Sequence, residues 1–425
     1  MTVGVYTLGC KVNMYESEFV INRLKDAGYE IKDFLDVCDV YIINTCTVTN
    51  TSDIKSRKIV RQAIKRNPDA CIVVMGCFVE ANKDYREDGV DIIVGTKDKS
   101  KIVSLIDEFF VNKVFIDKTN NDEVVLFEDM FIDKFPGRTR AFVKIQDGCE
   151  NFCSYCIIPF VRGKCRSKRH DDVVSEIKSL VNNGYKEIVL TGIHTGNYGV
   201  DLGDSFANLL RDIVKIDGLK RLRISSIEIT ELTDEVLDII KNNDVIADHF
   251  HVPLQSGSDK VLKLMNRKYD LAYYFEIINK ILEIRPNASI TTDIIVGFPG
   301  EDEDDFLCLM DTVRRVHFSK IHVFPYSKRN GTKAATMNNQ IPEVSKKDRA
   351  RRLLKLSMEL EKDYYNNFLG EKVEVLSECV KDGYTYGHTS NYISVKIKGE
   401  YASNQLINVI LKEIEYPYVV GEVNE

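Results

Sequence analysis

Three cysteines lie within eight residues near the middle of the chain, in the segment Cys149-Glu-Asn-Phe-Cys153-Ser-Tyr-Cys156. A [4Fe-4S] cluster is normally held by four thiolates. Three thiolates in one short loop would therefore leave one iron with an open coordination position, as catalytic metal sites do. We interpret this loop as a cluster site whose open position takes a small molecule.

The alternatives for this loop are a structural zinc site and buried apolar thiols. Zinc sites prefer four ligands arranged in closely spaced pairs. No fourth Cys or His lies at such a spacing, because the nearest thiol is Cys165 and His170 belongs to a basic segment. Ligand count and spacing favour the iron–sulfur interpretation.

A second set of three cysteines is spread over the first 80 residues. This region alternates apolar runs with helical patterns, which predicts a parallel, doubly wound sheet with strands at 3–8, 40–44, 71–75 and 91–94 and helices at 17–27 and 53–65. Cys10, Cys46 and Cys77 each follow the end of a predicted strand. Ligands of open parallel sheets bind beyond the carboxyl ends of the strands, so we expect these thiols to converge. Three unrelated buried thiols are the alternative.

The elements around residues 139–367 must position the short cysteine loop. Six apolar runs alternate with helical stretches, which predicts a partial (β/α)6 barrel with strands at 141–145, 187–190, 221–225, 249–254, 289–296 and 320–325. The cysteine loop follows the first strand, at the edge where such barrels carry their chemistry. Other polar or small residues fall at the same edge, namely Thr191, Gly192, His194, Glu228, Gln255, Asp293 and Gly297.

The whole chain divides into three units. We predict an α/β domain at residues 1–112, a polar connection at 113–138, the partial barrel at 139–367 and a small all-β barrel at 368–425. The N-terminus shows no leader peptide and no run approaches the length of a membrane span, which predicts a soluble, cytoplasmic protein without a membrane partner. Eleven cysteines in such a compartment favour metal or catalytic roles over disulfides.

Charge restricts how the chain could meet RNA. A formal net charge of -7 argues against a protein that coats nucleic acid by bulk electrostatics. Any RNA contact must be local, and the basic segment just after the cysteine loop is one candidate. Its predicted RNA contacts are Arg162, Lys164, Arg166 and Lys168.

Several motifs together resemble one enzyme family over nearly the whole chain. They are Thr7-Leu-Gly-Cys10-Lys-Val-Asn13, Asn44-Thr-Cys46-Thr-Val-Thr, Gly76-Cys77, Asp147-Gly-Cys149 through Pro159, Leu190-Thr-Gly-Ile-His194, Pro253-Leu-Gln-Ser-Gly257 and His322-Val-Phe-Pro-Tyr-Ser327. The chain resembles the radical S-adenosylmethionine (SAM) methylthiotransferases. It looks most similar to the tRNA type that acts on N6-threonylcarbamoyladenosine, and its last unit looks like the TRAM domain of that family.

The resemblance implies a set of cofactors and roles. Cys149, Cys153 and Cys156 would hold the SAM-cleaving [4Fe-4S] cluster, and Cys10, Cys46 and Cys77 an auxiliary [4Fe-4S] cluster that presents sulfur. A deoxyadenosyl radical from SAM would take the hydrogen of adenine carbon 2, which no side-chain base can remove at neutral pH, and a second SAM would supply the methyl group. We predict SAM contacts from Tyr155, Thr191, Gly192, Glu228, Gln255, Asp293 and Gly297.

The implied partners are the anticodon loop of tRNA, an electron donor such as flavodoxin or ferredoxin, and a sulfur source. The target adenosine lies beside the anticodon in a single-stranded loop, where a base can be reached. Three alternatives stay open: an isopentenyladenosine tRNA methylthiotransferase, a methylthiotransferase for an aspartate of a ribosomal protein, and a non-catalytic iron–sulfur sensor that binds RNA.

Overall fold

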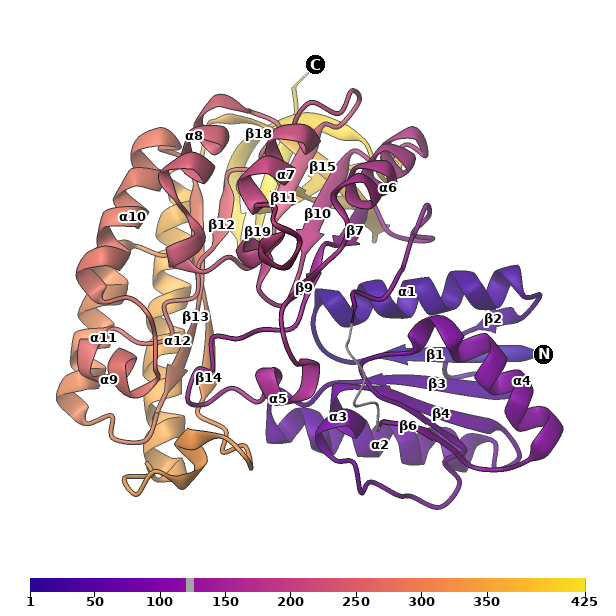
Figure 1. Cartoon of the computed structure of the whole chain (residues 1–425). Helices are drawn as coiled ribbons and strands as arrows, with labels where there is room; N and C mark the ends of the chain where they lie inside the picture. Colours follow the sequence, from indigo (N-terminus) through magenta and orange to yellow (C-terminus); the bar gives the residue numbers. More distant parts are fainter. Residues whose placement is uncertain (120–125, 425) are drawn as a thin grey trace.

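The N-terminal part of the chain is a six-stranded parallel sheet in the order β2-β1-β3-β4-β5-β6. Figure 1 shows the computed structural model, which describes residues 1–119 and 126–424. The strands are β1 (Thr2–Thr7), β2 (Glu30–Lys32), β3 (Val40–Thr45), β4 (Cys71–Gly76), β5 (Ile92–Val94) and β6 (Ile116–Lys118). Every residue of β3 and β4 is buried, because helices cover both faces of the sheet.

Four helices and one 3-10 turn connect these strands. They are α1 (Lys11–Asp26), α2 (Asn50–Arg66), α3 (Cys77–Ala81), η1 (Lys99–Lys101) and α4 (Ile102–Asn112). The first helix begins six residues before the predicted start at residue 17. Its first turns bury Asn13 and Glu16 as well as Val12 and Tyr15, so polar residues interrupt the apolar pattern that marks a helix in sequence.

The predicted connection at 113–138 contributes a strand of its own. β6 lies inside it and completes the N-terminal sheet. Residues 120–125 of this connection, and residue 425 at the end of the predicted C-terminal domain, lie outside the described residues. The domain limits stay predictions.

Six parallel strands form the partial barrel. They are β7 (Arg140–Lys144), β10 (Glu187–Thr191), β11 (Arg221–Ile224), β12 (His249–His251), β13 (Ser289–Val296) and β14 (Lys320–Pro325). Two three-stranded sheets, β11-β10-β7 and β12-β13-β14, are joined by parallel bridges between Leu222 and Ile246 and between Ser226 and His251. No pairing between β7 and β14 is present among the described residues, so the barrel stays open on that side. The predicted partial barrel is confirmed.

Helices cover the outside of this barrel, as Figure 1 shows. They are α6 (His170–Asn182), α7 (Phe206–Ile213), α8 (Asp234–Asn242), α9 (Asp259–Leu264), α10 (Leu271–Ile284), α11 (Glu303–Val316) and α12 (Glu343–Asn366). Shorter pieces decorate its loops, namely β8 (Gln146–Asp147), α5 (Ile158–Arg162), β9 (Arg166–Ser167), η2 (Thr195–Asn197), η3 (Val200–Leu202), η4 (Ile229–Glu231) and η5 (Lys333–Thr336).

The C-terminal strands close into a small barrel in the order β15-β16-β17-β19-β18. They are β15 (Lys372–Lys381), β16 (Tyr384–Thr389), β17 (Ser394–Lys398), β18 (Leu406–Glu415) and β19 (Tyr418–Val423). Alternate side chains fill its interior, among them Val375, Val395, Val409 and Val419. This closed barrel confirms the predicted all-β unit, although β16 and β19 are not among the runs that periodicity alone marks, because half of their residues are polar or glycine.

Candidate active site

The three distant cysteines lie beyond the carboxyl ends of neighbouring strands. Cys10 follows β1 and caps α1, Cys46 follows β3, and Cys77 begins α3 directly after β4. Strands β1, β3 and β4 are adjacent in the sheet, so its edge brings the three residues to one region. The cysteines of this set are called the sheet triad below.

Glycines before two of these cysteines make close approach possible. Gly9 has φ +108°, and a side chain there would place its first carbon 3.2 Å from Cys46 Sγ. Gly76 has φ +101°, and its first side-chain carbon would lie 2.6 Å from Asn44 Oδ1. Only glycine tolerates both constraints, so the loops can wrap closely around a group held by the sulfurs.

The thiols of the sheet triad influence one another electrostatically. The pKa of the Cys77 thiol is raised to about 11, mainly by burial, with Arg162 opposing this rise and Cys10 and Cys46 adding to it. Burial also raises the pKa of Cys46, with a contribution from Cys10. Thiols that interact in this way suit a bound cation or cluster, because a positive centre removes the mutual repulsion of the thiolates. The donor set fits a [4Fe-4S] cluster with one open position.

The short cysteine loop, called the loop triad below, follows β7 and β8 at the carboxyl end of the partial barrel. Backbone bonds fix its shape: Cys149 N–H donates to Gly163 O at 3.0 Å, Ser154 N–H to Met265 O at 2.9 Å, and Cys156 N–H to Cys153 O at 2.9 Å. Burial is the largest cause that raises the pKa of Cys156 to about 12, and the neighbouring Cys153 and Cys149 thiols contribute to this rise. This set also offers three sulfurs, as the sequence spacing requires.

Arg267 contacts the loop triad, and sequence reasoning did not identify it. Its Nη1 donates to Cys153 Sγ at 3.2 Å, its side chain is 3% exposed, and it forms an ion pair with Glu228. A buried guanidinium beside this sulfur would stabilise a negatively charged cluster held by the loop triad. No spacing signal marks this residue, because it lies 114 positions from its sulfur partner.

The predicted SAM contacts lie in four different surroundings. Tyr155, Gln255 and Asp293 line a small cavity of about 170 Å³ that also borders Cys156, while Thr191 and Gly192 line the larger chamber described below. Glu228 is engaged by Arg267. Gly297, at φ +70°, packs against Lys346 and donates its N–H to Glu301 at 2.8 Å. The seven SAM contacts stay predictions, and the first three lie nearest the loop triad.

The predicted RNA contacts differ in their exposure. Arg162, Arg166 and Lys168 are buried and form ion pairs with Asp147 or Glu16 and with Glu176, and together with Lys164 they line one cavity of about 920 Å³. Contact of these three residues with RNA stays a prediction. Lys164 is exposed and stays a predicted RNA contact.

These buried ion pairs join the N-terminal sheet to the partial barrel. Glu16 on α1 accepts from Lys144 at 2.8 Å and from Arg162 at 3.0 Å, and Asn13 Oδ1 accepts from Arg162 at 2.9 Å. On the other side, Arg329 donates to Thr47 at 2.6 Å, next to Cys46. The contacts hold the sheet triad against the edge of the barrel.

A chamber of about 630 Å³ lies where these parts meet. Cys10 and Lys11 line it from the N-terminal sheet, and the partial barrel contributes polar side chains from five strands or strand ends. The C-terminal barrel closes it with Asn391, Tyr392 and His388, and the Tyr392 ring stacks on His249 and His388 with centroids 4.7 Å apart. The chamber therefore brings residues of all three units together around one cavity, with Cys10 of the sheet triad in its wall.

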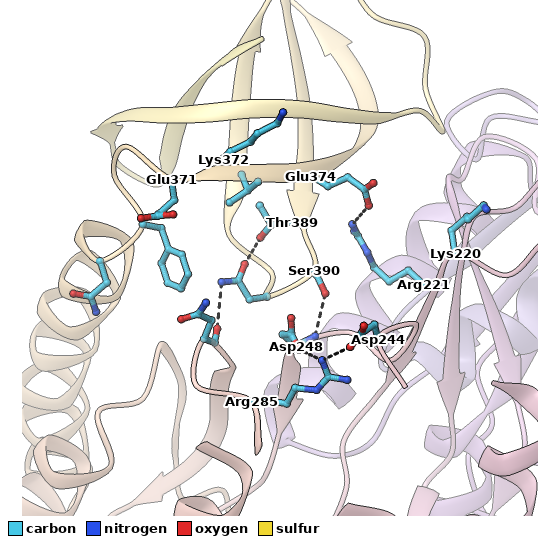
Figure 2. Close-up of a pocket in the computed structure, with 15 residues that line it drawn as sticks. Lys220, Arg221, Asp244, Asp248, Arg285, Glu371, Lys372, Glu374, Thr389 and Ser390 are labelled. Atoms are coloured by element: carbon cyan, nitrogen blue, oxygen red, sulfur yellow. Dashed lines mark hydrogen bonds and ion pairs between the residues drawn. The ribbon is translucent and has the colours of Figure 1, made fainter. Parts of the chain in front are cut away.

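A separate pocket of about 580 Å³ lies where the C-terminal barrel meets the partial barrel (Figure 2). Arg221 pairs with Glu374 at 3.2 Å, Asp248 N–H donates to Ser390 at 3.1 Å, and Arg285 pairs with Asp244 at 3.1 Å. Its cations and anions balance, and it lies at the amino ends of β11 and β12, away from the cysteines. We interpret this pocket as part of the interface through which the C-terminal barrel packs against the partial barrel.

Comparisons with known proteins agree with this geometry. Residues 143–313 match the Radical SAM superfamily, and residues 2–95 match the family described as Uncharacterized protein family UPF0004. A solved structure of the radical S-adenosylmethionine methyltransferase TsrM from Kitasatospora setae shares the fold, with a TM-score of 0.56 at 15% identity over 79% of this chain and 75% of that one. The partial barrel, its cysteine loop and these matches define a radical SAM enzyme.

Relatives that match nearly the whole chain show to which family of radical SAM enzymes it belongs. The chain is 44% identical over 432 residues to the Bacillus subtilis (strain 168) threonylcarbamoyladenosine tRNA methylthiotransferase MtaB, covering 99% of this chain and 96% of that protein. It is 37% identical to the Acetivibrio thermocellus tRNA-2-methylthio-N(6)-dimethylallyladenosine synthase, covering 88% of this chain and 80% of that protein. The chain belongs to the radical SAM methylthiotransferase family. No helix of the described residues is both long and apolar enough to span a bilayer.

Proposed function

We propose that this enzyme methylthiolates carbon 2 of N6-threonylcarbamoyladenosine next to the anticodon of tRNA. The observation that carries the proposal is that each three-cysteine set borders one of two neighbouring cavities. Cys10 of the sheet triad lines the chamber, Cys156 of the loop triad lines the smaller cavity, and Asp293 and Phe324 line both. The relative named for this reaction matches over almost its full length and at higher identity than the relative named for the dimethylallyl derivative.

The residues of the chain supply the arrangement that such a reaction needs. Cys149, Cys153 and Cys156 would hold a [4Fe-4S] cluster with SAM at its open iron, and together they supply radical chemistry for an unactivated carbon. Cys10, Cys46 and Cys77 would hold a second cluster, with Cys10 in the chamber wall. The hydroxyl of Tyr392 and the side chain of Asn391, both in the chamber wall, are polar groups that a base can contact. A one-electron donor such as flavodoxin or ferredoxin and a separate sulfur source complete the reaction, in the cytoplasm where tRNA is modified.

Nucleoside mass spectrometry of tRNA from a strain that lacks the gene tests the substrate. We expect the 2-methylthio derivative of N6-threonylcarbamoyladenosine to disappear while its unmethylthiolated precursor accumulates. Loss of the 2-methylthio dimethylallyl nucleoside would assign the chain to that substrate instead. Unchanged tRNA together with loss of the modification on a ribosomal-protein aspartate would show that the chain is a methylthiotransferase for that aspartate.

Measurement of SAM cleavage distinguishes an enzyme from a non-catalytic iron–sulfur sensor that binds RNA. Anaerobic holoenzyme incubated with SAM and dithionite should release 5′-deoxyadenosine, measured by liquid chromatography. A protein with an intact cluster that releases none would be an RNA-binding iron–sulfur sensor.

A further inference from the structure

Lys11 is the cation of the chamber that lacks an acidic partner. It begins α1 directly after Cys10, is partly buried, and lines the chamber. Among the described residues no carboxylate lies within ion-pair distance of its ammonium group.

The carboxylates that line the same chamber are already occupied. Asp293 pairs with His251 at 3.3 Å, and Glu361 pairs with Lys320 at 3.0 Å. Glu187, which interacts electrostatically with Lys11, forms an ion pair with Arg223 at 2.7 Å. A cation removed from water without a counter-charge is costly, so this position is prepared for an anion that arrives with a ligand.

The substrate of the proposed function brings such an anion. Threonine joined through its nitrogen to the carbamoyl group keeps a free carboxylate, which is ionised at neutral pH. Carbon 2 and the exocyclic N6 lie on the same edge of adenine, separated by N1. A base that presents carbon 2 to the sheet triad at Cys10 therefore directs its N6 substituent toward the neighbouring Lys11.

We propose that Lys11 binds the carboxylate of the threonylcarbamoyl group and selects this nucleoside over one with an apolar N6 substituent. The inference rests on the proposed function and adds the residue that sets its substrate preference. His322, on the chamber wall from β14, offers a ring N–H to the same carboxylate. An apolar dimethylallyl group would leave the Lys11 ammonium buried and unpaired. The enzyme would then favour the threonylcarbamoyl nucleoside through its ion pair with Lys11 and disfavour the dimethylallyl nucleoside because it leaves that charge unpaired.

Binding of anticodon stem-loop RNA to the anaerobic holoenzyme tests the proposal. Three RNAs are compared: one with N6-threonylcarbamoyladenosine, one with the methyl ester of that group, and one with plain adenosine. Esterification removes the negative charge and keeps the shape. We expect the wild-type enzyme to lose roughly 10- to 100-fold in affinity on esterification, the usual effect of one charge-assisted hydrogen bond.

Three variants isolate the charge of Lys11. Lys11→Met should bind the acid and the ester equally, and Lys11→Arg should restore most of the preference for the acid. Lys320→Met is the matched control, because Lys320 lines the same chamber but already pairs with Glu361, and it should keep the preference. A Lys11→Met enzyme with wild-type iron content that still prefers the acid overturns the inference.

Analysis of the reaction products distinguishes failure of the proposed function from failure of the inference about Lys11. Wild-type enzyme that methylthiolates only a dimethylallyl RNA overturns the proposed function and this inference with it. Wild-type enzyme that methylthiolates the threonylcarbamoyl RNA, combined with unchanged acid–ester discrimination in Lys11→Met, overturns the inference alone.

Discussion

Arg162 shows how a single buried cation can organise two parts of the molecule. Its guanidinium lies between Glu16 on α1 and Asp147 after β7, with both oxygens 3.0 Å away, and its side chain is fully buried. Burial and these neighbours have opposite effects on Glu16: burial raises its pKa, while Arg162, Lys144 and Lys99 outweigh burial and lower it. The network is stable only while every charge keeps its partner.

Replacing Arg162 should therefore destabilise the protein strongly. Arg162→Met leaves Glu16 and Asp147 with fewer counter-charges, which we expect to cost about 3–5 kcal/mol of unfolding free energy in urea titrations. Lys164→Met, two positions away at the exposed surface, should change stability by less than about 0.5 kcal/mol. It should instead weaken tRNA binding and reduce its salt dependence by about one ion. Equal destabilisation by the two variants would contradict the structural role of Arg162.

The sequence does not reveal which members of this basic segment are buried. Arg162, Lys164, Arg166 and Lys168 look alike as a run of alternating charges, which is typical of a solvated surface. The difference comes from carboxylates distant in sequence, since Glu16 lies 146 positions before Arg162. The same limit hides Arg267 and the unpaired state of Lys11. The cysteine sets, in contrast, were identified because short spacing or strand ends place them.

At the scale of elements, strands β10 and β11 hold the C-terminal barrel in place. Glu187 begins β10 and accepts from Arg223 at 2.7 Å and from Arg221 at 3.2 Å on the adjacent strand. Arg223 in turn donates to Ser390 O at 3.0 Å, and Arg221 pairs with Glu374 on β15. One buried carboxylate thus orients two guanidinium groups that bind the C-terminal barrel, of which Arg221 is drawn in Figure 2 with its partner Glu374.

Neutralising Glu187 should loosen this interface. In Glu187→Gln the two arginines lose their shared counter-charge, and we expect docking to weaken by at least about 2 kcal/mol, or roughly 30-fold in the population of the open state. Hydrogen exchange of residues 388–394 should accelerate accordingly. Glu374→Gln is the control, because that carboxylate is 49% exposed and its pair with Arg221 contributes little. Unchanged hydrogen exchange of residues 388–394 in Glu187→Gln would show that apolar contacts alone hold the C-terminal barrel against the partial barrel.

The pH dependence of this contribution follows from the direction of the Glu187 shift. Burial raises the pKa of Glu187, but Arg223 and Arg221 outweigh burial and lower it. A carboxylate with a lowered folded-state pKa stabilises the protein above its unfolded pKa of about 4.3 and loses this effect as pH falls toward the folded value. The stability difference between wild type and Glu187→Gln should thus be constant from about pH 7 to 5 and shrink below about pH 4.3. A difference that grows in acid would mean that Glu187 is protonated in the folded state.

At the scale of the whole molecule, alternation of strands and helices predicted the sheet and the partial barrel, and short apolar runs predicted the small β barrel. Counting six strand–helix units predicted that the larger barrel is partial, whereas the order of the strands and the short strands β2 and β6 were not predicted. The chamber could not be predicted, since Lys11, His251 and Tyr392 come from three separate units that meet only in the folded chain.

The separate positions of the two cysteine sets lead to a test that needs the intact enzyme. If each set holds one cluster of the four-thiolate type with a missing ligand, the reconstituted holoenzyme should carry about eight irons and eight sulfides per chain. Cys46→Ala should reduce both to about four, abolish methylthiolation and leave part of the SAM cleavage to 5′-deoxyadenosine intact. Cys149→Ala should also lose about half of the iron but should abolish cleavage completely. Loss of cleavage in Cys46→Ala with the loop-triad cluster still present would show that the two sets act as one unit, through the ion pairs that join α1 to the barrel.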